Sequence, residues 1–327
     1  MTTADLLATM DVLFGDQAWP KPFHIVRATD LVDHGFDVAV AAQEVGTTGK
    51  RVERACRSPD LIRDVLDVGM SDIEPSHLER AAQILGGLLL GRCAELAFER
   101  IYTAEMETDE FELRDLRESR TDTDYRLYNG QGRPVYRINI KFHGSQFRRA
   151  LELVGLASED CFPLATYKIN SALQKQSEEG LPYFFAIVGV PHLTGAIVGE
   201  GIPESMIELV ALVQRSKRAT RKRDIEDAVV NFMVVAKNTT YRHTLSRILN
   251  SDWYVLSARR ADILLRKLLF ERVFALRVRN FARAFRGAEL DMHFSLSTDL
   301  IPLRTFLRAL RAGGPQHITT LMERGDF

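Results

Sequence analysis

The sequence has little of what marks secreted or membrane-spanning proteins. Its 327 residues include 3 cysteines, an odd number without the spacing of a zinc site. These cysteines do not suggest a disulfide framework, and a reduced, cytoplasmic setting is the simpler expectation. No apolar run in the sequence reaches the ~18 residues that a membrane span needs. The start, MTTADLLATMDVLFGDQ, lacks the basic region of a signal peptide. We expect a globular cytoplasmic protein without a membrane partner.

Net charge is also nearly absent, but the charges are unevenly distributed. The formal net charge is −1, whereas residues 215–286 hold 18 Lys and Arg against 6 Asp and Glu. Such an excess of positive charge indicates a polyanionic partner, although solvated helix faces give the same count. Within this region, residues 261–285 have helical periodicity. One face carries Phe270, Phe274, Phe281 and Phe285, which we expect in the core, and the other carries arginines that include Arg279 and Arg283.

The length suits one large or two ordinary domains, with 46% hydrophobic and 27% charged residues. The composition along the chain predicts three regions. They are a helical segment at 1–74, an α/β core at 75–200, and a basic helical or mixed region at 201–327. The fold class we expect is α/β.

The first region contains a pattern typical of a helix-turn-helix. Residues 38–45 lead through the turn Gly-Thr-Thr-Gly into residues 50–57. Ala42, Gly46 and Val52 have the spacing of the positions that pack two such helices together. The second helix would be amphipathic. Its basic face carries Lys50, Arg54 and Arg57 with Arg51 near the edge, and its apolar face carries Val52, Ala55 and Cys56. This is what a DNA-recognition helix needs, but plain structural helix pairs share the pattern.

A β-hairpin is predicted in the second region. Residues 125–128 form a short β-rich run, Asn129-Gly130 and Gly132 supply turn chemistry, and residues 135–142 form the second strand. Side chains alternate between the two faces of a strand. One face would carry Ile138, Ile140 and Phe142, and the other Arg137, Asn139, Lys141 and His143. Asp124, at the start of the first strand, is placed to join the polar row. Solvated edge residues would look the same, and for His143 that is the simpler interpretation.

Further elements surround this hairpin. Residues 74–102 predict a long helix, bent or interrupted at Gly86-Gly87, and residues 111–117 a strand. After the hairpin come an amphipathic helix at 164–176 and a near-continuous apolar run at 183–190, typical of a buried strand. The order is helix, three strands, helix, strand.

This arrangement resembles the PD-(D/E)XK nuclease superfamily, which has the restriction-endonuclease-like αβββαβ core, over residues 83–190. The family's Gly-x-x-x-Glu matches Gly91 to Glu95, and its metal-binding aspartate matches Asp124. Its (Asp/Glu)-x-Lys falls on Asn139-Ile140-Lys141, with Asn139 where an acid is usual. Asp122 and Glu118 are alternatives to Asp124.

The resemblance implies a residue-level site. Asp124 and Asn139 would bind Mg²⁺, joined by the main-chain carbonyl of Ile140. Lys141 would polarise the attacking water or the scissile phosphate, and Glu95 would support the metal or its water. An amide oxygen still ligates a hard cation, but it brings no charge. Asn139 therefore leaves open whether the site is active.

The function implied is Mg²⁺-dependent hydrolysis of double-stranded DNA by a type II restriction endonuclease or related defence nuclease. A homodimer would match a palindromic target, and a cognate DNA methyltransferase would be a partner. Two alternatives remain: a non-catalytic DNA-binding or regulatory protein on the same fold, and an RNA-processing nuclease.

Overall fold

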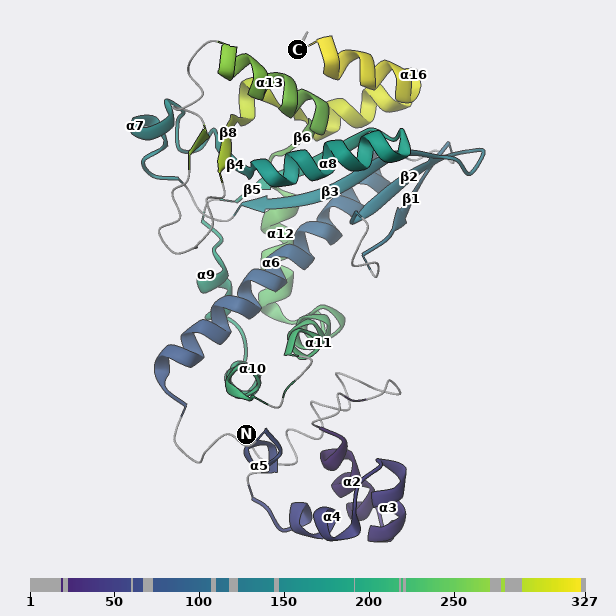
Figure 1. Ribbon diagram of the computed structural model, residues 1–327, viewed down its shortest axis with the longest axis vertical. Helices are drawn as coiled ribbons and strands as arrows, with labels where there is room; N and C mark the ends of the chain where they lie inside the picture. Colours follow the sequence, from purple (N-terminus) through teal and green to yellow (C-terminus); the bar gives the residue numbers. More distant parts are fainter. Residues whose placement is uncertain are drawn as a thin grey trace. The chain divides into compact units, whose positions relative to one another are not determined.

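The computed structural model describes residue 19 and residues 23–59, 61–66, 73–106, 110–117, 123–143, 147–190, 192–217, 219, 222–270, 278–279 and 290–324. The chain is a mixed α/β protein, and it divides into two compact units whose elements are labelled in Figure 1. Unit 1 comprises Met1–Arg92 and Thr194–Thr244, and unit 2 comprises Cys93–Leu193 and Leu245–Phe327.

These units differ from the predicted regions at 1–74, 75–200 and 201–327. The difference arises because residues 194–244 join the N-terminal helices, while residues from 245 onward add strands to the sheet of unit 2. The basic stretch at 215–286 is consequently divided between the units. Some of its charges are neutralised locally, as in the Arg223–Asp227 and Arg266–Asp262 pairs.

The regular elements among the described residues of unit 1 are helices. Its elements are α2 (His24–Asp33), α3 (Val38–Glu44), α4 (Gly49–Cys56), α5 (Leu61–Leu66), the first part of α6 (Pro75–Glu105), α9 (Gly195–Gly199), α10 (Glu204–Arg215), α11 (Lys222–Val235) and the start of α12 (Thr239–Leu249). The Ser216 hydroxyl donates to the main-chain oxygen of Leu66 at 3.0 Å and so links the end of α10 to the end of α5.

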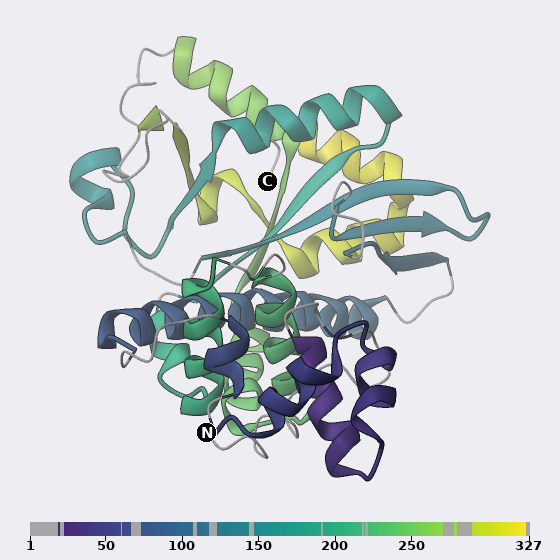
Figure 2. The same cartoon turned by 60° about the horizontal axis from the view of Figure 1, so that its bottom comes forward.

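The predicted pair of helices at 38–45 and 50–57 is confirmed as α3 and α4. Asp37 caps α3 by accepting the Ala39 N–H at 2.7 Å. The turn between the helices uses Gly46, whose φ of +66° is a left-handed conformation that glycine adopts without strain. Val52 is fully buried, and α2 packs against both helices, as the purple and dark blue helices of Figure 2 show.

Helix α6 runs without a break through the two glycines where a bend was expected. The reason for Gly86 is close packing: a Cβ there would lie 1.8 Å from the main-chain oxygen of Gly195 in α9. A Cβ at Gly87, one position on, would meet nothing within 4 Å. The first glycine is thus required by an approaching backbone, and the second is not.

This contrast gives a matched pair of substitutions. Gly86→Ala is expected to lower the free energy of unfolding by roughly 1–3 kcal/mol, the usual cost of overpacking. Gly87→Ala is expected to raise it by roughly 0.5–1 kcal/mol, because alanine is the better helix former. Urea unfolding of both variants measures the difference. Equal effects of the two substitutions would contradict the packing of α6 on α9.

Unit 2 is built on a six-stranded mixed sheet in the order β1-β2-β3-β5-β6-β9. Its strands are β1 (Phe111–Asp115), β2 (Tyr125–Asn129), β3 (Pro134–His143), β5 (Tyr183–Gly189), β6 (Trp253–Ser257) and β9 (Ile301–Pro302). Strands β3 and β5 are parallel and the other neighbours are antiparallel. A smaller sheet has the order β4-β8-β7, with β4 (Cys161–Ala165), β7 (Val278–Arg279) and β8 (Asp291–Ser295).

The predicted hairpin is confirmed as β2 and β3. The Asn129 side-chain oxygen accepts the N–H groups of Gln131 and Arg133, both at 3.0 Å, and closes the turn. Gly132 adopts a φ of +70°. The predicted element order is also present, as α6, β1, β2, β3, α8 (Thr166–Glu179) and β5. The short helix α7 (Ala150–Val154) and β4 are inserted before α8.

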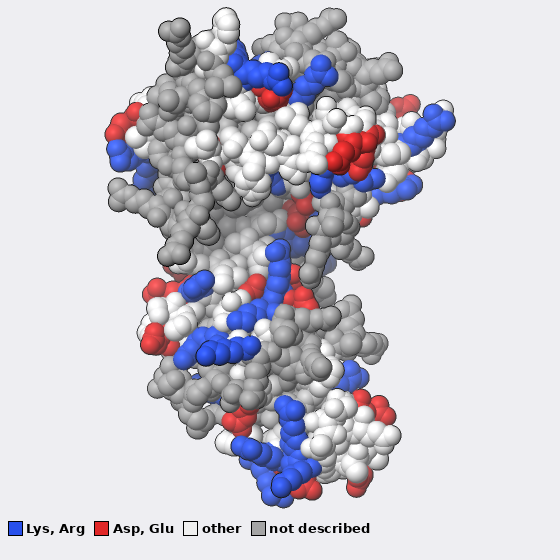
Figure 3. Space-filling model, viewed as in Figure 1, with Lys and Arg blue, Asp and Glu red and all other residues white. Residues whose placement is uncertain are grey.

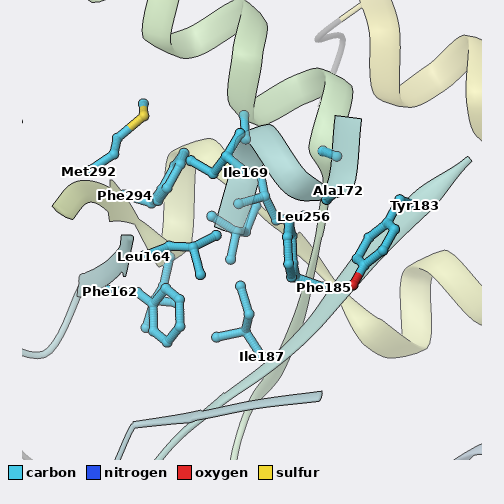
Figure 4. Packing of buried hydrophobic residues seen from close by; sticks show 14 residues of the cluster. Phe162, Leu164, Ile169, Ala172, Tyr183, Phe185, Ile187, Leu256, Met292 and Phe294 are labelled. Carbon is cyan, nitrogen blue, oxygen red and sulfur yellow. The ribbon is translucent and has the colours of Figure 1, made fainter. Parts of the chain in front are cut away.

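Helices cover both faces of the large sheet. On one face, Phe185 and Leu256 pack with residues of α8 and of α13 (Ala258–Phe270) in the cluster of Figure 4. On the other face, Phe98 of α6 contacts Tyr125 with ring centroids 5.5 Å apart. Phe306 of α16 (Leu303–Arg324) contacts Phe184 of β5 at 5.1 Å. The short helix α15 (Leu296–Asp299) follows β8.

The predicted helix at 261–285 is wrong in its later part. Helix α13 ends at Phe270, which is 91% exposed and therefore not a core residue. Val278 and Arg279 form β7, which pairs with Met292 and Asp291 of β8. Pairing with a distant strand overrides the local helical periodicity there. Phe274, Phe281, Phe285 and Arg283 lie outside the described residues.

One described helix, α6, is long and apolar enough to cross a membrane by length and composition. Half of its most apolar window is buried inside the protein, and core helices of globular proteins share these properties. No disulfide joins Cys56, Cys93 and Cys161.

Candidate functional site

The candidate site lies where the ladder between β2 and β3 ends. The last paired residues are Tyr125 and Ile138, so Asp124 and Asn139 are the next positions across from each other. Asp124 closes the ladder with its side chain, because its Oδ2 accepts the N–H of Ile140 at 2.6 Å. In a strand, the N–H and C=O of one residue point to the same side. The Ile140 carbonyl is therefore directed to the same edge as the Asp124 carboxylate.

Asn139 supplies an unusual oxygen to this edge. Its side-chain carbonyl oxygen is buried and has no hydrogen-bond partner in the structure. A buried polar group without a partner costs about 1–3 kcal/mol, so most buried polar groups are paired. The Asn139 oxygen is an exception, and it is an unsatisfied acceptor that is available to a ligand.

Lys141 lies on the same face as Asn139, two residues along β3. Its Nζ donates to the Ile140 carbonyl at 3.2 Å and lies 5.9 Å from the centroid of the Phe185 ring. Burial lowers the pKa of Lys141 to about 8, with Asp124 opposing the shift and Lys168 of α8 adding to it. Burial raises the pKa of Asp124 and the Asp115 carboxylate adds to the shift, whereas the Ile140 N–H and Lys141 oppose it.

The lowered pKa of Lys141 makes a testable contribution to stability. An unfolded lysine has a pKa of about 10.4, so between roughly pH 8 and 10.4 the unfolded chain binds more protons than the folded chain. Folding stability from this group therefore rises with pH across that interval. Lys141→Met is expected to stabilise the protein by roughly 2–3 kcal/mol more at pH 7 than at pH 10.4.

Urea unfolding of wild type and variant at both pH values measures this difference. Lys237→Met, which removes a positive charge at an exposed position, is the control. A stabilisation by Lys141→Met that is independent of pH would contradict the burial of the ammonium group.

Glu95 is held in a different cluster. Its Oε2 lies 2.5 Å from Nη1 of Arg117, which also binds Glu99 at 2.8 Å and Asp115. The Tyr125 hydroxyl donates to Glu99 at 2.7 Å, and burial raises the pKa of Tyr125. Tyr125 and Asp124 are successive residues and project to opposite faces of the sheet. The structure thus brings together Asp124, Asn139, Ile140 and Lys141. Glu95 is instead paired with Arg117 on the face of the sheet to which Tyr125 projects.

The predicted DNA-binding residues are also found in separate places. Lys50, Arg51, Arg54 and Arg57 are all exposed on or next to α4, and Figure 3 shows positive side chains gathered over this helix. Cys56, placed on the apolar face, is exposed instead. Arg279 lies in β7, and Arg283 falls outside the described residues, as do Asp122 and Glu118.

Three neighbours of the site lack a clear signal in the sequence. Phe185 comes beside Lys141 through the parallel pairing of β3 with β5, and Arg117 reaches Glu95 from the end of β1. Lys168 approaches from α8, and its place in the amphipathic helix after the hairpin was the single indication. Arg137, in the polar row of β3, is buried against Glu179 of α8 rather than in the site.

The oxygens at this edge are a carboxylate, an amide carbonyl and a main-chain carbonyl, the donor types that hard cations such as Mg²⁺ prefer. Among the described residues, no three His, Cys, Asp or Glu side chains are grouped to hold a metal. The carboxylate that contacts the main chain of β3 beside Asn139 is that of Asp124. Comparison with protein families, curated proteins and solved structures gives no match to this chain.

Proposed function

We propose that the protein is a Mg²⁺-dependent endonuclease that hydrolyses phosphodiester bonds of double-stranded DNA. The observation that carries the proposal is the buried, unpartnered oxygen of Asn139 beside Asp124 and Lys141. The order α6, β1, β2, β3, α8, β5 supports assigning unit 2 to the restriction-endonuclease-like fold. A type II restriction enzyme or related defence nuclease in the cytoplasm fits this assignment.

The residues at the start of β2 and on β3 beside it fit a hard cation. The Oδ2 of Asp124 accepts the Ile140 N–H, and its Oδ1 is the carboxylate oxygen proposed to bind the cation. Asn139 adds a neutral side-chain oxygen that has no hydrogen-bond partner. The Ile140 carbonyl is the third protein donor. Water and substrate phosphate commonly complete the coordination of Mg²⁺. A bound Mg²⁺ supplies positive charge that offsets the negative charge developing on the phosphate.

Lys141 has the properties that this reaction needs from a side chain. With a pKa of about 8, its amine exchanges a proton near neutral pH. The charged form stabilises the phosphate in the transition state, and the neutral form accepts a proton from the attacking water. The contact with the Ile140 carbonyl positions Nζ, and the apolar ring of Phe185 strengthens its electrostatic effect by excluding water.

Duplex DNA is favoured over RNA by the helices of unit 1. A helix such as α4 enters the major groove of B-form DNA, whereas the major groove of A-form RNA is too deep and narrow to be read. The four basic side chains at α4 lie on its exposed side, opposite the buried Val52 and Ala55. We propose that α4 is the recognition helix.

Removing charge from α4 is expected to weaken binding in a salt-dependent manner. Each neutralised phosphate contributes roughly −0.9 to the slope of log K against log salt. Changing Lys50 and Arg54 together to glutamine should therefore make the slope shallower by roughly 0.9 for each phosphate that these side chains neutralise. Titration of a labelled duplex at several salt concentrations measures the slope. Arg223→Gln, at an exposed pair in α11, is the control, and an unchanged slope in the double variant would show that α4 is a solvated face.

A second candidate is a non-catalytic DNA-binding or regulatory protein on the same fold. It is favoured by the donor set, in which Asp124 brings a negative charge and Asn139 brings none. Mg²⁺ affinity of such a set is expected to be low.

Nicking of supercoiled plasmid tests the proposed function. We expect cleavage in Mg²⁺, none in EDTA, and stronger competition by duplex DNA than by RNA. Binding of DNA without cleavage in Mg²⁺ or Mn²⁺ would favour the second candidate. Cleavage that is equal in EDTA would overturn both, because each assigns this edge to a metal.

One site of this kind hydrolyses one strand, so we propose that a double-strand cut requires two copies, most simply a homodimer with two-fold symmetry. A restriction enzyme also needs a cognate DNA methyltransferase to protect host DNA.

A further inference from the structure

A cavity of about 290 Å³ lies beyond Lys141, at the end of β3. It is lined by His143 and Gly189, the last residues of the parallel strands β3 and β5, and by Asp252 and Tyr254 at the start of antiparallel β6. Phe162 of β4 closes one side, with its ring edge-on to His143 at 5.9 Å. The cavity therefore belongs to unit 2 and lies at the end of the sheet toward which β3 leads.

The charges of the described lining residues disfavour a phosphate. Glu159 and Asp252 are exposed carboxylates at the cavity, and no lysine or arginine is among its described lining residues. Asp252 also contributes to the raised pKa of Tyr254, although burial is the larger cause. His143, Ser158, Asn250 and Ser251 also line the cavity and can donate or accept hydrogen bonds. The two carboxylates favour a ligand that donates hydrogen bonds, and the rings of Phe162 and Tyr254 favour one with a flat face. A flat group with an exocyclic amine meets both requirements.

The position of the cavity relates it to the proposed cleavage site. His143 is two residues beyond Lys141 on the same face of β3, about 7 Å along the strand. A nucleotide next to a phosphate at Lys141 therefore reaches the cavity with its base. The volume is at the lower end of the ~300–1,000 Å³ typical of small-molecule pockets. It suits one base, and not a base pair.

We propose that this cavity binds a single unpaired nucleobase carrying an exocyclic amine, such as cytosine, next to the phosphate at Lys141. The inference rests on the proposed nuclease function. Carboxylates accept hydrogen bonds from the cytosine amine, whereas the carbonyl that uracil has at the same position offers no proton. A base leaves the stack at a cost of a few kcal/mol in a paired duplex, and at less cost where it has no partner. Unpaired bases are therefore the sensitive probes.

The test compares short labelled duplexes that differ at one position, measured by fluorescence anisotropy with the full chain in EDTA. One duplex has dC opposite an abasic site, one has dU there, and one is fully paired. We expect the dC duplex to bind about tenfold more tightly than the dU duplex, a typical base discrimination. In the double variant Glu159→Gln with Asp252→Asn, this ratio should fall to about one. Glu152→Gln, an exposed acid of the same unit, is the control and should keep the ratio.

The outcomes separate this proposal from the proposed function. Equal binding of the dC and dU duplexes by wild type, together with metal-dependent plasmid nicking, would overturn the base pocket alone. A preference for dC that survives in the double variant would also overturn it, because the preference would then arise elsewhere. Absence of both DNA binding and nicking would remove the nuclease function and this proposal with it.

Discussion

Replacing Lys141 with methionine is expected to lower metal-dependent plasmid nicking by about two to three orders of magnitude, the usual effect of losing one preorganised group at a transition state. Methionine keeps most of the apolar stem against Phe185 and removes the amine that lies 3.2 Å from the Ile140 carbonyl. Duplex affinity should largely persist, because phosphate contacts elsewhere supply most of it. Initial rates of nicking and anisotropy titrations separate the two effects.

Two further variants sharpen this test. Lys237→Met removes an exposed lysine and should nick at the wild-type rate. Lys141→Arg should fail to restore activity, because an arginine stays protonated and presents a planar fork in place of a compact ammonium group. Wild-type nicking by Lys141→Met would show that the site has been assigned to the wrong strand end.

Replacing Asn139 with leucine is expected to make the protein more stable and inactive. The substitution removes a buried oxygen that has no partner, which should raise the free energy of unfolding by about 1–3 kcal/mol. It also removes a proposed ligand, so nicking should be lost at all Mg²⁺ concentrations. Asn139→Asp adds a negative charge to the donor set, so it should retain activity or raise it at low Mg²⁺. Urea unfolding and nicking across a Mg²⁺ titration measure both effects.

Asn129 provides the matched control in the same hairpin. Its side-chain oxygen accepts two main-chain N–H groups at 3.0 Å, so Asn129→Leu should destabilise the protein by about 1 kcal/mol or more. Destabilisation by Asn139→Leu as well would show that the Asn139 oxygen is satisfied. If wild type is inactive in Mg²⁺ and Mn²⁺ and Asn139→Asp nicks, the protein is the non-catalytic binder.

The sequence by itself determined those features that depend on short-range periodicity. Alternation of side chains placed Asn139 and Lys141 on one face of β3, and turn residues located the turn that joins β2 to β3. The spacing through Gly46 located α3 and α4. In each case the residues that specify the element lie within a few positions of one another, so no knowledge of distant partners was needed.

Only the tertiary structure decided what depends on distant partners. The pairing of β7 with β8 ended the helical pattern before Arg279, and the close approach of the α9 backbone requires a residue without a Cβ at Gly86. Arg117 drew Glu95 into an ion pair on the Tyr125 side of the sheet. The Asn139 oxygen is buried and unpartnered at the point where β2 begins and Asp124 accepts the Ile140 N–H. Burial and charge pairing depend on residues that are distant in the sequence and close in space, so they cannot be predicted from local periodicity.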